Sequence, residues 1–437
     1  MNRHFHKLAL PIVAFFIFPS LGAAEELNAG SQLHRLISLE EMVRTVLQHN
    51  PRVQAAALGS EAARATVTSA SALQNPRIES TVGRNAARLP SSNSGNLGGW
   101  GVSQFIENPA VRRARTEAAN FNLAISEQLI ASTKSELVAQ VRIKAFEHLL
   151  RKDEARAATD ALQLLEQIRA RVKVRVESGE AARYEIIKAD AEVINARQKL
   201  QTALLQVEQS VLAINRLAAG SLPAHWRLRE TLGDMIEPPA LEQIQQSAQL
   251  NNPELKALQA ETARREAKLQ ETQAGRWPGI ELRYGQLKDA DISQRSLTAS
   301  LQIPLLDQRH GAIQESIAEL SRARLLLDSR RTELAQQVLQ AWKSMEIARV
   351  KVNALSTGAV REAEAAVRVA EAAYRFGERG ILDVLDAQRV LRQVNADLLD
   401  ARFQLRTAGV DLEYLAGLYA DTDKLNSALS TNPVTVN

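Results

Sequence analysis

The chain of 437 residues contains no cysteine. This absence excludes disulfide bonds, thiolate metal sites and a lipid-modified N-terminal cysteine, so we expect a protein that is not a lipoprotein. Aromatic residues make up only 4% of the chain. Beyond the N-terminal region no stretch approaches the ~18 continuous apolar residues of a transmembrane helix. Ala, Leu, Arg, Glu and Gln dominate instead. That composition is typical of long exposed helices and not of one large globular core.

Motifs of enzymes and metal sites are also missing. The 7 histidines are scattered without the spacing of metal ligands, so we expect no metal site. The sequence has no phosphate loop, nucleophile elbow or metalloprotease helix. We therefore expect no enzyme and no cofactor, and we expect His49 and His148 to be solvated helix residues. Positive and negative charges alternate along the chain, so the formal net charge of +4 indicates no nucleic-acid partner.

Residues 1–24 have the pattern of a secretory signal peptide. A basic start is followed by an apolar run over 8–21 and by the small residues Gly-Ala-Ala over 22–24. The run is too short to span a membrane as a helix. We expect this segment to be cleaved, so that the mature chain crosses an inner membrane and opens with a polar segment over 25–37.

The mature chain carries the same pattern twice. The segment Asn50–Ala55 returns as Asn252–Ala257, and in each copy a second proline follows at the same distance, Pro76 and Pro278. Later landmarks pair at one constant offset, namely Gly179 with Gly377 and Leu217-Ala218 with Leu415-Ala416. We therefore predict an internal twofold repeat, with copies over 38–220 and 251–417, a linker over 221–250 and a polar tail over 418–437. Pseudo-symmetry of this kind in transport proteins usually surrounds a pathway.

Helix and strand signals follow the same order in both copies. In the first copy, Ser38 and Glu41 form a capping box before one helix, and Pro51 starts a second helix. The next predicted elements are a β-hairpin over 78–106 with strands 78–83 and 100–106, a long helix over 112–178 and a return helix over 181–217. The second copy has a β-hairpin over 280–305, a long helix over 312–376 and a return helix over 381–415. The linker contains several prolines and should break helical order at mid-height.

The two long helices are the most unusual of these predictions. No proline or glycine interrupts 112–178, and only Gly358 interrupts 312–376. At ~1.5 Å per residue, such a helix spans roughly 100 Å. The second long helix carries an apolar seam with alternating steps of four and three residues, as in a coiled coil: Leu334, Val338, Ala341, Met345, Ala348, Val352, Leu355 and Ala359. An ordinary coiled coil would explain this seam but neither the signal peptide nor the hairpins.

The four predicted strands cannot close a barrel within one chain. In lipid, open sheet edges would leave backbone groups unpaired, which is costly. Three chains would supply twelve strands, an even number within the range of outer-membrane barrels. Four aromatic residues fall near the ends of the predicted strands, where an interfacial belt would lie: Trp100, Phe105, Trp277 and Tyr284. The same residues could instead cap a small soluble sheet.

The segment Tyr374–Ala387 (YRFGERGILDVLDA), together with the duplicated Asn-Pro starts, the hairpins and the long helices, resembles the TolC-type outer-membrane efflux proteins. The resemblance covers residues 38–417, nearly the whole mature chain. It implies a fold that is mainly α with a small β-barrel. In that fold a homotrimer forms a twelve-stranded barrel in the outer membrane, continued by a long α-helical barrel through the periplasm.

The resemblance also implies a gate at the periplasmic end. Asp383 and Asp386 would line its aperture, Tyr374 and Arg379 would tie neighbouring helices, and Glu185 would be the acidic partner of those ties. Three copies of the Asp383 and Asp386 pair would form a ring that attracts cations. The residues alone leave a simpler alternative, because two acids in the first turn of a helix favour its macrodipole without any function.

Members of that family work in three-part machines. The resemblance therefore implies three partners: outer-membrane lipid, an inner-membrane pump of the RND or ABC type, and a periplasmic adaptor. The adaptor should contact the tip loops at Gly179, Glu180, Gly377 and Gly380. Gly179–Ala189 and Val102–Phe105 look most like the heavy-metal-efflux branch. Drug efflux and type I protein secretion stay open as alternatives, and so does a periplasmic coiled-coil adaptor or scaffold without a pore.

Overall fold

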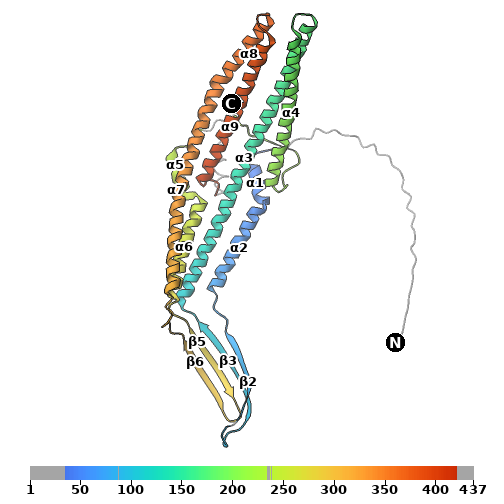
Figure 1. Cartoon of the computed structure of the whole chain (residues 1–437). Coiled ribbons are helices and arrows are strands. Elements are labelled where there is room, and N and C mark those ends of the chain that lie inside the picture. Colours follow the sequence, from blue (N-terminus) through green and yellow to red (C-terminus); the bar gives the residue numbers. More distant parts are fainter. Residues whose placement is uncertain (1–34, 87, 234–236, 238, 421–437) are drawn as a thin grey trace, which may run out of the picture.

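The computed structural model describes residues 35–86, 88–233, 237 and 239–420. The predicted signal peptide and most of the predicted C-terminal tail lie outside these residues. The described chain is elongated, with two helical hairpin tips at one end and a β-sheet at the other (Figure 1). Long helices connect the two ends.

The first half is built around one uninterrupted helix, α3 (Pro109–Glu177). It has 69 residues, which corresponds to roughly 100 Å. Asn108 caps it, because its side chain accepts a hydrogen bond from the Ala110 amide at 2.9 Å. The helices α1 (Leu39–His49), α2 (Pro51–Ser71) and α4 (Arg183–Leu217) pack beside α3. α2 covers the half of α3 nearer the sheet and α4 the half nearer the tip (Figure 1).

The elements of the second half follow the same order, with two departures from the predictions. α5 (Leu241–Asn251) lies in the predicted linker, so the prediction that 221–250 breaks helical order is wrong over its last part. Earlier in the linker, β4 (Trp226–Leu228) pairs in parallel with β1 (Arg35–Ile37).

The second departure concerns the long helix of this half. After α6 (Pro253–Ala274), it consists of α7 (His310–Ala354), a π-helical turn η1 (Leu355–Ala359) that contains Gly358, and α8 (Val360–Arg375). The return helix α9 (Ile381–Leu415) begins and ends as predicted. The second long helix is therefore broken where its sequence holds a glycine.

A four-stranded antiparallel sheet forms the opposite end of the molecule. Its order is β2 (Arg77–Asn85), β3 (Gly95–Ile106), β5 (Ile280–Lys288) and β6 (Ser293–Leu301), so β2 and β6 are its edges. Trp100 and Tyr284 lie in the middle of their strands, so the prediction that they fall near strand ends is wrong. Their rings meet edge to face with centroids 5.8 Å apart.

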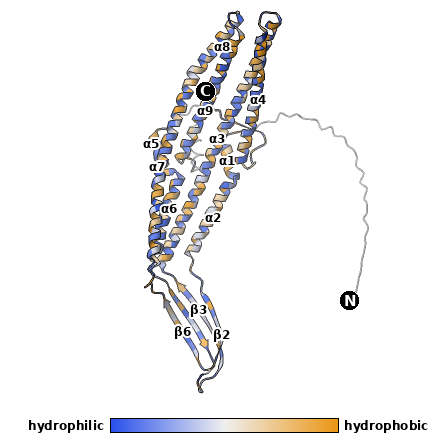
Figure 2. Ribbon diagram, in the orientation of Figure 1, coloured by the Kyte–Doolittle hydropathy of each residue, from blue (hydrophilic) through white to orange (hydrophobic). Residues whose placement is uncertain are grey.

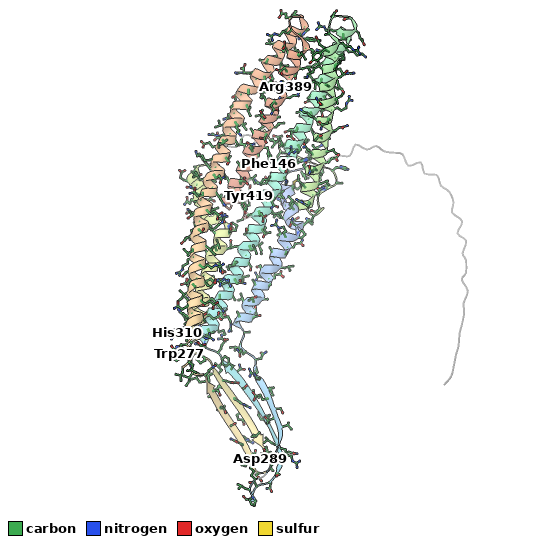
Figure 3. All side chains as sticks on the ribbon, in the orientation of Figure 1. Phe146, Trp277, Asp289, His310, Arg389 and Tyr419 are labelled. Carbon is green, nitrogen blue, oxygen red and sulfur yellow. The ribbon has the colours of Figure 1, made fainter. Side chains whose placement is uncertain are left out.

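A charged pair stabilises the junction between the sheet and the helices. Arg115 on α3 donates two hydrogen bonds to the Glu107 carboxylate, at 2.8 and 2.9 Å, and a third to the Ala70 carbonyl of α2. The hydrogen bond to Glu107 raises the pKa of Arg115. Trp277 and His310 are at the same junction (Figure 3). Arg115 thereby holds the residue that follows β3 against both α3 and α2.

The duplicated Asn-Pro motif has a structural cause. Asn50 and Asn252 are both 5% exposed and cap the helices that follow them. Each amide group also donates to the end of a return helix, Asn50 to the Leu217 carbonyl at 2.8 Å and Asn252 to the Leu415 carbonyl at 3.2 Å. Each asparagine therefore joins the beginning of one helix to the end of another.

The core is divided into clusters along the long axis. One cluster at mid-height joins α1, α3 and α4 to the β1–β4 pair, and a second joins α7 to α5 and α9. Five residues of the predicted seam are buried in the second cluster: Leu334, Val338, Met345, Ala348 and Val352. The described residues include no helix long and apolar enough to span a membrane, and polar and apolar residues are mixed along the helices (Figure 2).

His148 contradicts the prediction of a solvated residue. It is 7% exposed in the first cluster, where a ring nitrogen lies 2.8 Å from the Ser210 hydroxyl and the ring packs on Trp226. Burial, and to a lesser degree the charge of Lys152, lowers the pKa of His148 to about 4. His148 is thus a neutral core residue at neutral pH.

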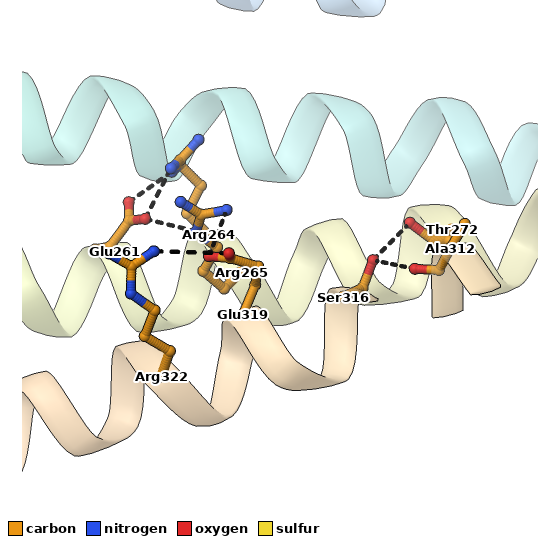
Figure 4. A network of polar contacts seen from close by, with 8 residues as sticks. All are labelled: Glu261, Arg264, Arg265, Thr272, Ala312, Ser316, Glu319 and Arg322. Atoms are coloured by element: carbon orange, nitrogen blue, oxygen red, sulfur yellow. Dashed lines mark hydrogen bonds and ion pairs between the residues drawn. The ribbon is translucent and has the colours of Figure 1, made fainter. Parts of the chain in front are cut away.

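Ion pairs strengthen the contact between α6 and α7. Glu261 accepts hydrogen bonds from Arg264 and Arg265, and Arg265 also pairs with Glu319 of α7 at 3.4 Å (Figure 4). Burial alone would raise the pKa of Glu261, but these hydrogen bonds lower it below its ordinary value. The carboxylate therefore stays ionised within the contact.

Candidate functional site

Both helical hairpins turn on a glycine with left-handed backbone geometry. Gly179 has φ 79° and Gly377 has φ 76°. Each turn closes with the two hydrogen bonds of a Schellman motif, Glu180 to Arg175 and Gly179 to Val176 in the first hairpin. Other residues would be strained at these two positions. Gly380, in contrast, precedes α9 with φ −77°, which any residue can adopt.

The predicted aperture residues lie on the exposed face of the first turns of α9. Asp383 and Asp386 are exposed, whereas Ile381 and Val384 on the opposite face are buried. Asp383 pairs with Arg379 at 3.6 Å, and Asp386 pairs with Arg389. Arg379 therefore stands beside a predicted aperture residue, and among the described residues no hydrogen bond or cation–π contact joins it to Tyr374. Each acid has a basic neighbour, but pairs as exposed as these are weak.

The cation beside Tyr374 is Arg175, which sequence reasoning missed. Its guanidinium carbon lies 4.7 Å from the centre of the Tyr374 ring. Interaction of the guanidinium with the Tyr374 hydroxyl is the largest cause that raises the pKa of Arg175, and the charges of Glu180 and Glu185 raise it less. The Tyr374 hydroxyl and the Glu185 Oε2 atom are buried and make no hydrogen bond within the described chain. The structure thus brings Tyr374 and the predicted partner Glu185 into one group, with Arg175 as its cation.

The tips of the two hairpins are packed together by a third apolar cluster. It joins α3, α4 and α9 through Leu165, Ile168, Val172, Val193, Ala196, Ile381, Val384 and Leu385. Arg392 of α9 pairs with Glu192 of α4 at 3.7 Å, and burial lowers the pKa of Arg392. Next to this cluster, a cavity of about 630 Å³ lies between α3, α4 and α9. Arg389 marks this level of the molecule in Figure 3.

The β-sheet has one apolar and one more polar face. Ile78, Val102, Tyr284 and Leu297 pair across all four strands, and their exposed fractions are 80%, 37%, 45% and 77%. Because side chains alternate along a strand, the neighbouring row points to the other face. This row is Arg77, Ser103, Arg283 and Thr298. Arg283 reaches across Gly101 to Glu79, with a nitrogen–oxygen distance of 2.5 Å.

The described residues contain no group of three His, Asp or Glu side chains that could hold a metal ion. The two ends of the molecule differ in their surfaces. The tip carries paired charges on long helices, and the sheet carries an exposed apolar face.

Known proteins share this architecture. The chain matches the family described as "Outer membrane efflux protein" over residues 42–220 and 244–418. It is similar to the cobalt-zinc-cadmium resistance protein CzcC of Cupriavidus metallidurans, with 22% identity over 428 residues that cover 95% of this chain and 100% of CzcC.

Solved structures show the same fold. The structure of CusC has a TM-score of 0.76 at 16% identity and covers 88% of this chain and 93% of its own. The outer membrane protein VceC of Vibrio cholerae has a TM-score of 0.74 at 15% identity and covers 87% of this chain and 96% of its own. The fold is mostly helical with a small sheet in each case.

Proposed function

Because the chain belongs to the outer membrane efflux protein family, we propose that it is the exit duct of a tripartite efflux system. It conducts substrates passively from an inner-membrane pump and a periplasmic adaptor to the outside. The family consists of efflux channels, so the chain is not an enzyme. A periplasmic adaptor or scaffold without a pore does not account for the family match.

The two faces of the sheet carry this proposal. An apolar row that is exposed on all four strands requires a non-aqueous environment, and lipid provides one. The edge strands β2 and β6 have free backbone groups, which lipid would leave unpaired. Three copies joined edge to edge would satisfy them in a twelve-stranded barrel, with the apolar row outside and Arg77, Arg283 and Glu79 facing the lumen. The twofold repeat then places the two hairpins of each copy around one pore.

The helices form the periplasmic part of the duct. α3 and the α7–α8 pair span the distance from sheet to tip, and a mature chain that begins after a cleaved signal peptide would carry them into the periplasm. The tips at Gly179, Glu180, Gly377 and Gly380 are the contact sites for the adaptor. The similarity to CzcC favours an RND-type pump that exports metal cations over drug efflux or type I protein secretion.

We place the gate at the tip of the second hairpin. Asp383 and Asp386 line the aperture, and Tyr374, Arg379 and Glu185 restrain the helices that carry them. Three copies of the two acids form a ring of carboxylates. Because their pairs with the exposed arginines beside them are weak, these carboxylates stay accessible to cations. Asp383→Asn with Asp386→Asn should raise the conductance at rest and weaken the block by divalent cations. Unchanged conductance and block would contradict this assignment.

Membrane fractionation and planar-bilayer recording test the function as a whole. The protein should stay in the outer-membrane fraction after high-salt and carbonate washes, and the purified oligomer should give discrete, long-lived, cation-selective steps. The variant with both acids neutralised guards against a gate that is sealed without its partners. Release by the washes, together with silence of both proteins, would overturn the proposal.

A further inference from the structure

The more polar face of the β-sheet carries an ion pair that passes over a whole strand. Glu79 is on the edge strand β2 and Arg283 is on β5, and β3 lies between these two strands (Figure 1). Adjacent strands are ~4.8 Å apart, so the pair bridges roughly 10 Å of sheet. An Arg283 nitrogen nevertheless lies 2.5 Å from a Glu79 carboxylate oxygen. The Arg283 side chain therefore lies along the sheet, whereas side chains of strands usually stand roughly perpendicular to it.

The position on β3 beneath this pair is a glycine. Gly101 is in register with Glu79 on one side and with Gly285 on the other. A Cβ atom at Gly101 would lie 3.5 Å from the Nε atom of Arg283, which is ordinary van der Waals contact. A side chain larger than alanine would therefore occupy the place of the guanidinium. The absence of a side chain at Gly101 gives Arg283 its path to Glu79.

The burial pattern of β3 is a second observation on the same contact. Most of the sheet is exposed, but Gly101 and Ser103 are buried, and Ser103 is only 3% exposed. Both are on the same face as Arg283, because residues in register share a face and alternate residues of a strand do so too. Ser103 is directly opposite Arg283 in the register. The Arg283 side chain thus covers a part of β3 that would otherwise be open.

We propose that Glu79 and Gly101 are positioning residues that hold Arg283 flat on the inner wall of the barrel, so that its charge is paired and its side chain stays out of the path of cations. The inference rests on the proposed function, which turns this face of the sheet towards the lumen of a duct for cations. Arginines that projected from three subunits would form a ring of positive charge and lower the local concentration of cations. Glu79 and Gly101 thereby favour the passage of cations over anions.

Thiol labelling tests the position of Arg283 without any need for conductance. The chain has no cysteine, so Ser103→Cys places a single thiol beneath the Arg283 side chain. A small, neutral, water-soluble methanethiosulfonate should label this thiol slowly in the full-length protein in lipid vesicles. Adding Glu79→Gln should raise the rate by about two- to fivefold, the range that an exposed ion pair supports, and adding Arg283→Ala should raise it further.

Glu281→Gln is the matched control for the loss of charge. Glu281 is on the same face of β5 as Arg283 but makes no ion pair among the described residues, so the labelling rate of Ser103→Cys should stay unchanged. If Glu79→Gln and Glu281→Gln raise the rate equally, Glu79 does not hold Arg283 in place and the proposal fails. It also fails if Arg283→Ala leaves the rate unchanged, because Arg283 then does not cover β3.

Val102→Cys separates failure of this proposal from failure of the barrel. Val102 is on the apolar face of β3, so its thiol should resist the water-soluble reagent when the protein is in lipid. Rapid labelling of Val102→Cys would refute a barrel in lipid, whatever the rates at Ser103→Cys show. A protein that never conducts would refute the duct and, with it, the effect on cations, while the labelling rates still decide how Arg283 is held.

Bilayer recording tests the consequence for cations. Gly101→Val changes no charge but takes the place of the guanidinium, so the cation-to-anion permeability ratio should fall by roughly twofold as Arg283 moves into the lumen. Gly98→Val is the matched control, since Gly98 is on the opposite face of β3 and an added Cβ meets no atom within 4 Å. With Arg283→Gln present, Gly101→Val should no longer lower the ratio. An equal fall with and without Arg283→Gln would overturn the proposal, because the bulk at Gly101 alone would then decide the ratio.

Discussion

The two long helices span the same distance from sheet to tip, yet only one of them is continuous (Figure 1). α3 keeps α-helical geometry for 69 residues, whereas η1 interrupts its counterpart between α7 and α8. In η1 the Val360 amide donates to the Leu355 carbonyl, one residue further back than in an α-helix. The Thr357 hydroxyl donates to the Asn353 carbonyl at 2.6 Å. This side-chain hydrogen bond satisfies a carbonyl group within the widened turn.

The surroundings of η1 explain why the break is there. The buried seam of α7 ends at Val352, and the apolar cluster of the tips lies further along the hairpin. Between these clusters, α9 lines the cavity with Gln388, Leu391, Arg392 and Leu399. No residue of η1 is buried. A helix therefore admits an extra residue where its packing is interrupted and keeps regular geometry where neighbours hold it on both sides.

A proline substitution should give the largest difference in stability between the two long helices. In the interior of α3, Ala158→Pro removes a backbone hydrogen bond and clashes with the preceding turn, which lowers the free energy of unfolding by about 3 kcal/mol or more. At Ser356, within η1, the turn is already widened, so Ser356→Pro should cost clearly less. Thermal unfolding followed by helical circular dichroism measures both, with Ala158→Ser and Ser356→Ala as controls that leave the backbone intact. Equal losses of stability for the two proline variants would show that η1 tolerates proline no better than α3 does.

The buried histidine should make the first half sensitive to acid. Unfolded His148 binds a proton near pH 6.5, but the folded protein binds it only near pH 4. The folded state therefore binds fewer protons between these values, and its stability falls as the pH drops from 6.5 to 4, by at most about 3.4 kcal/mol for each subunit. The corresponding position of α7 is Glu346, which pairs with Lys343, so the second half has no histidine there.

The difference between wild type and His148→Gln isolates this contribution. The variant should lose part of its stability at pH 7 but show a flatter decline between pH 6.5 and 4. His49→Gln, at an exposed position of α1, should follow the wild-type curve. Parallel curves for wild type and His148→Gln would exclude His148 as the source of acid sensitivity.

The long elements could be predicted from the sequence because their causes are local. Runs without proline and glycine, the Ser38 and Asn50 caps, and the turn glycines each act over a few residues. α5 was missed because Ala240 provides no side-chain cap. The second Asn-Pro motif held a usable signal, since the buried Met42 and Val46 of α1 correspond to the buried Ile244 and Ala248 of α5 when Asn50 is aligned with Asn252.

Features that depend on contacts between distant segments could not be predicted. His148 is buried by Ser210 and Trp226, which come from α4 and β4. The face of α3 that carries Arg175 can be read from helical spacing, but its position opposite Tyr374 depends on how two hairpins pack. The π-helical turn lies in the gap between two apolar clusters, and this gap depends on contacts between distant segments. From the sequence, Gly358 indicated only that the helix could be interrupted there.

Substitution of Asn50 and of Asn252 should destabilise the two halves equally. Asn50→Ala and Asn252→Ala each remove a helix cap, at a cost of about 1–2 kcal/mol, and also the bond to the Leu217 or Leu415 carbonyl. Asn→Asp keeps the capping acceptor but loses the amide donor, so it should be intermediate at both positions. Thermal midpoints of the four variants measure this. A large difference between the halves would mean that the two copies of the Asn-Pro motif no longer stabilise the fold in the same way.

The smallest effect concerns the glycine of η1 itself. Gly358→Ala should raise the free energy of unfolding by about 0.5–1 kcal/mol, because alanine loses less backbone entropy in a helix and the added Cβ meets no atom within 4 Å. The reverse change in α3, Ala157→Gly at an exposed position, should lower it by a similar amount. The thermal midpoints of the two variants should therefore shift in opposite directions from that of the wild type. If Gly358→Ala is destabilising, the π-helical turn needs glycine for its geometry, and the break comes from the sequence and not from the interrupted packing around it.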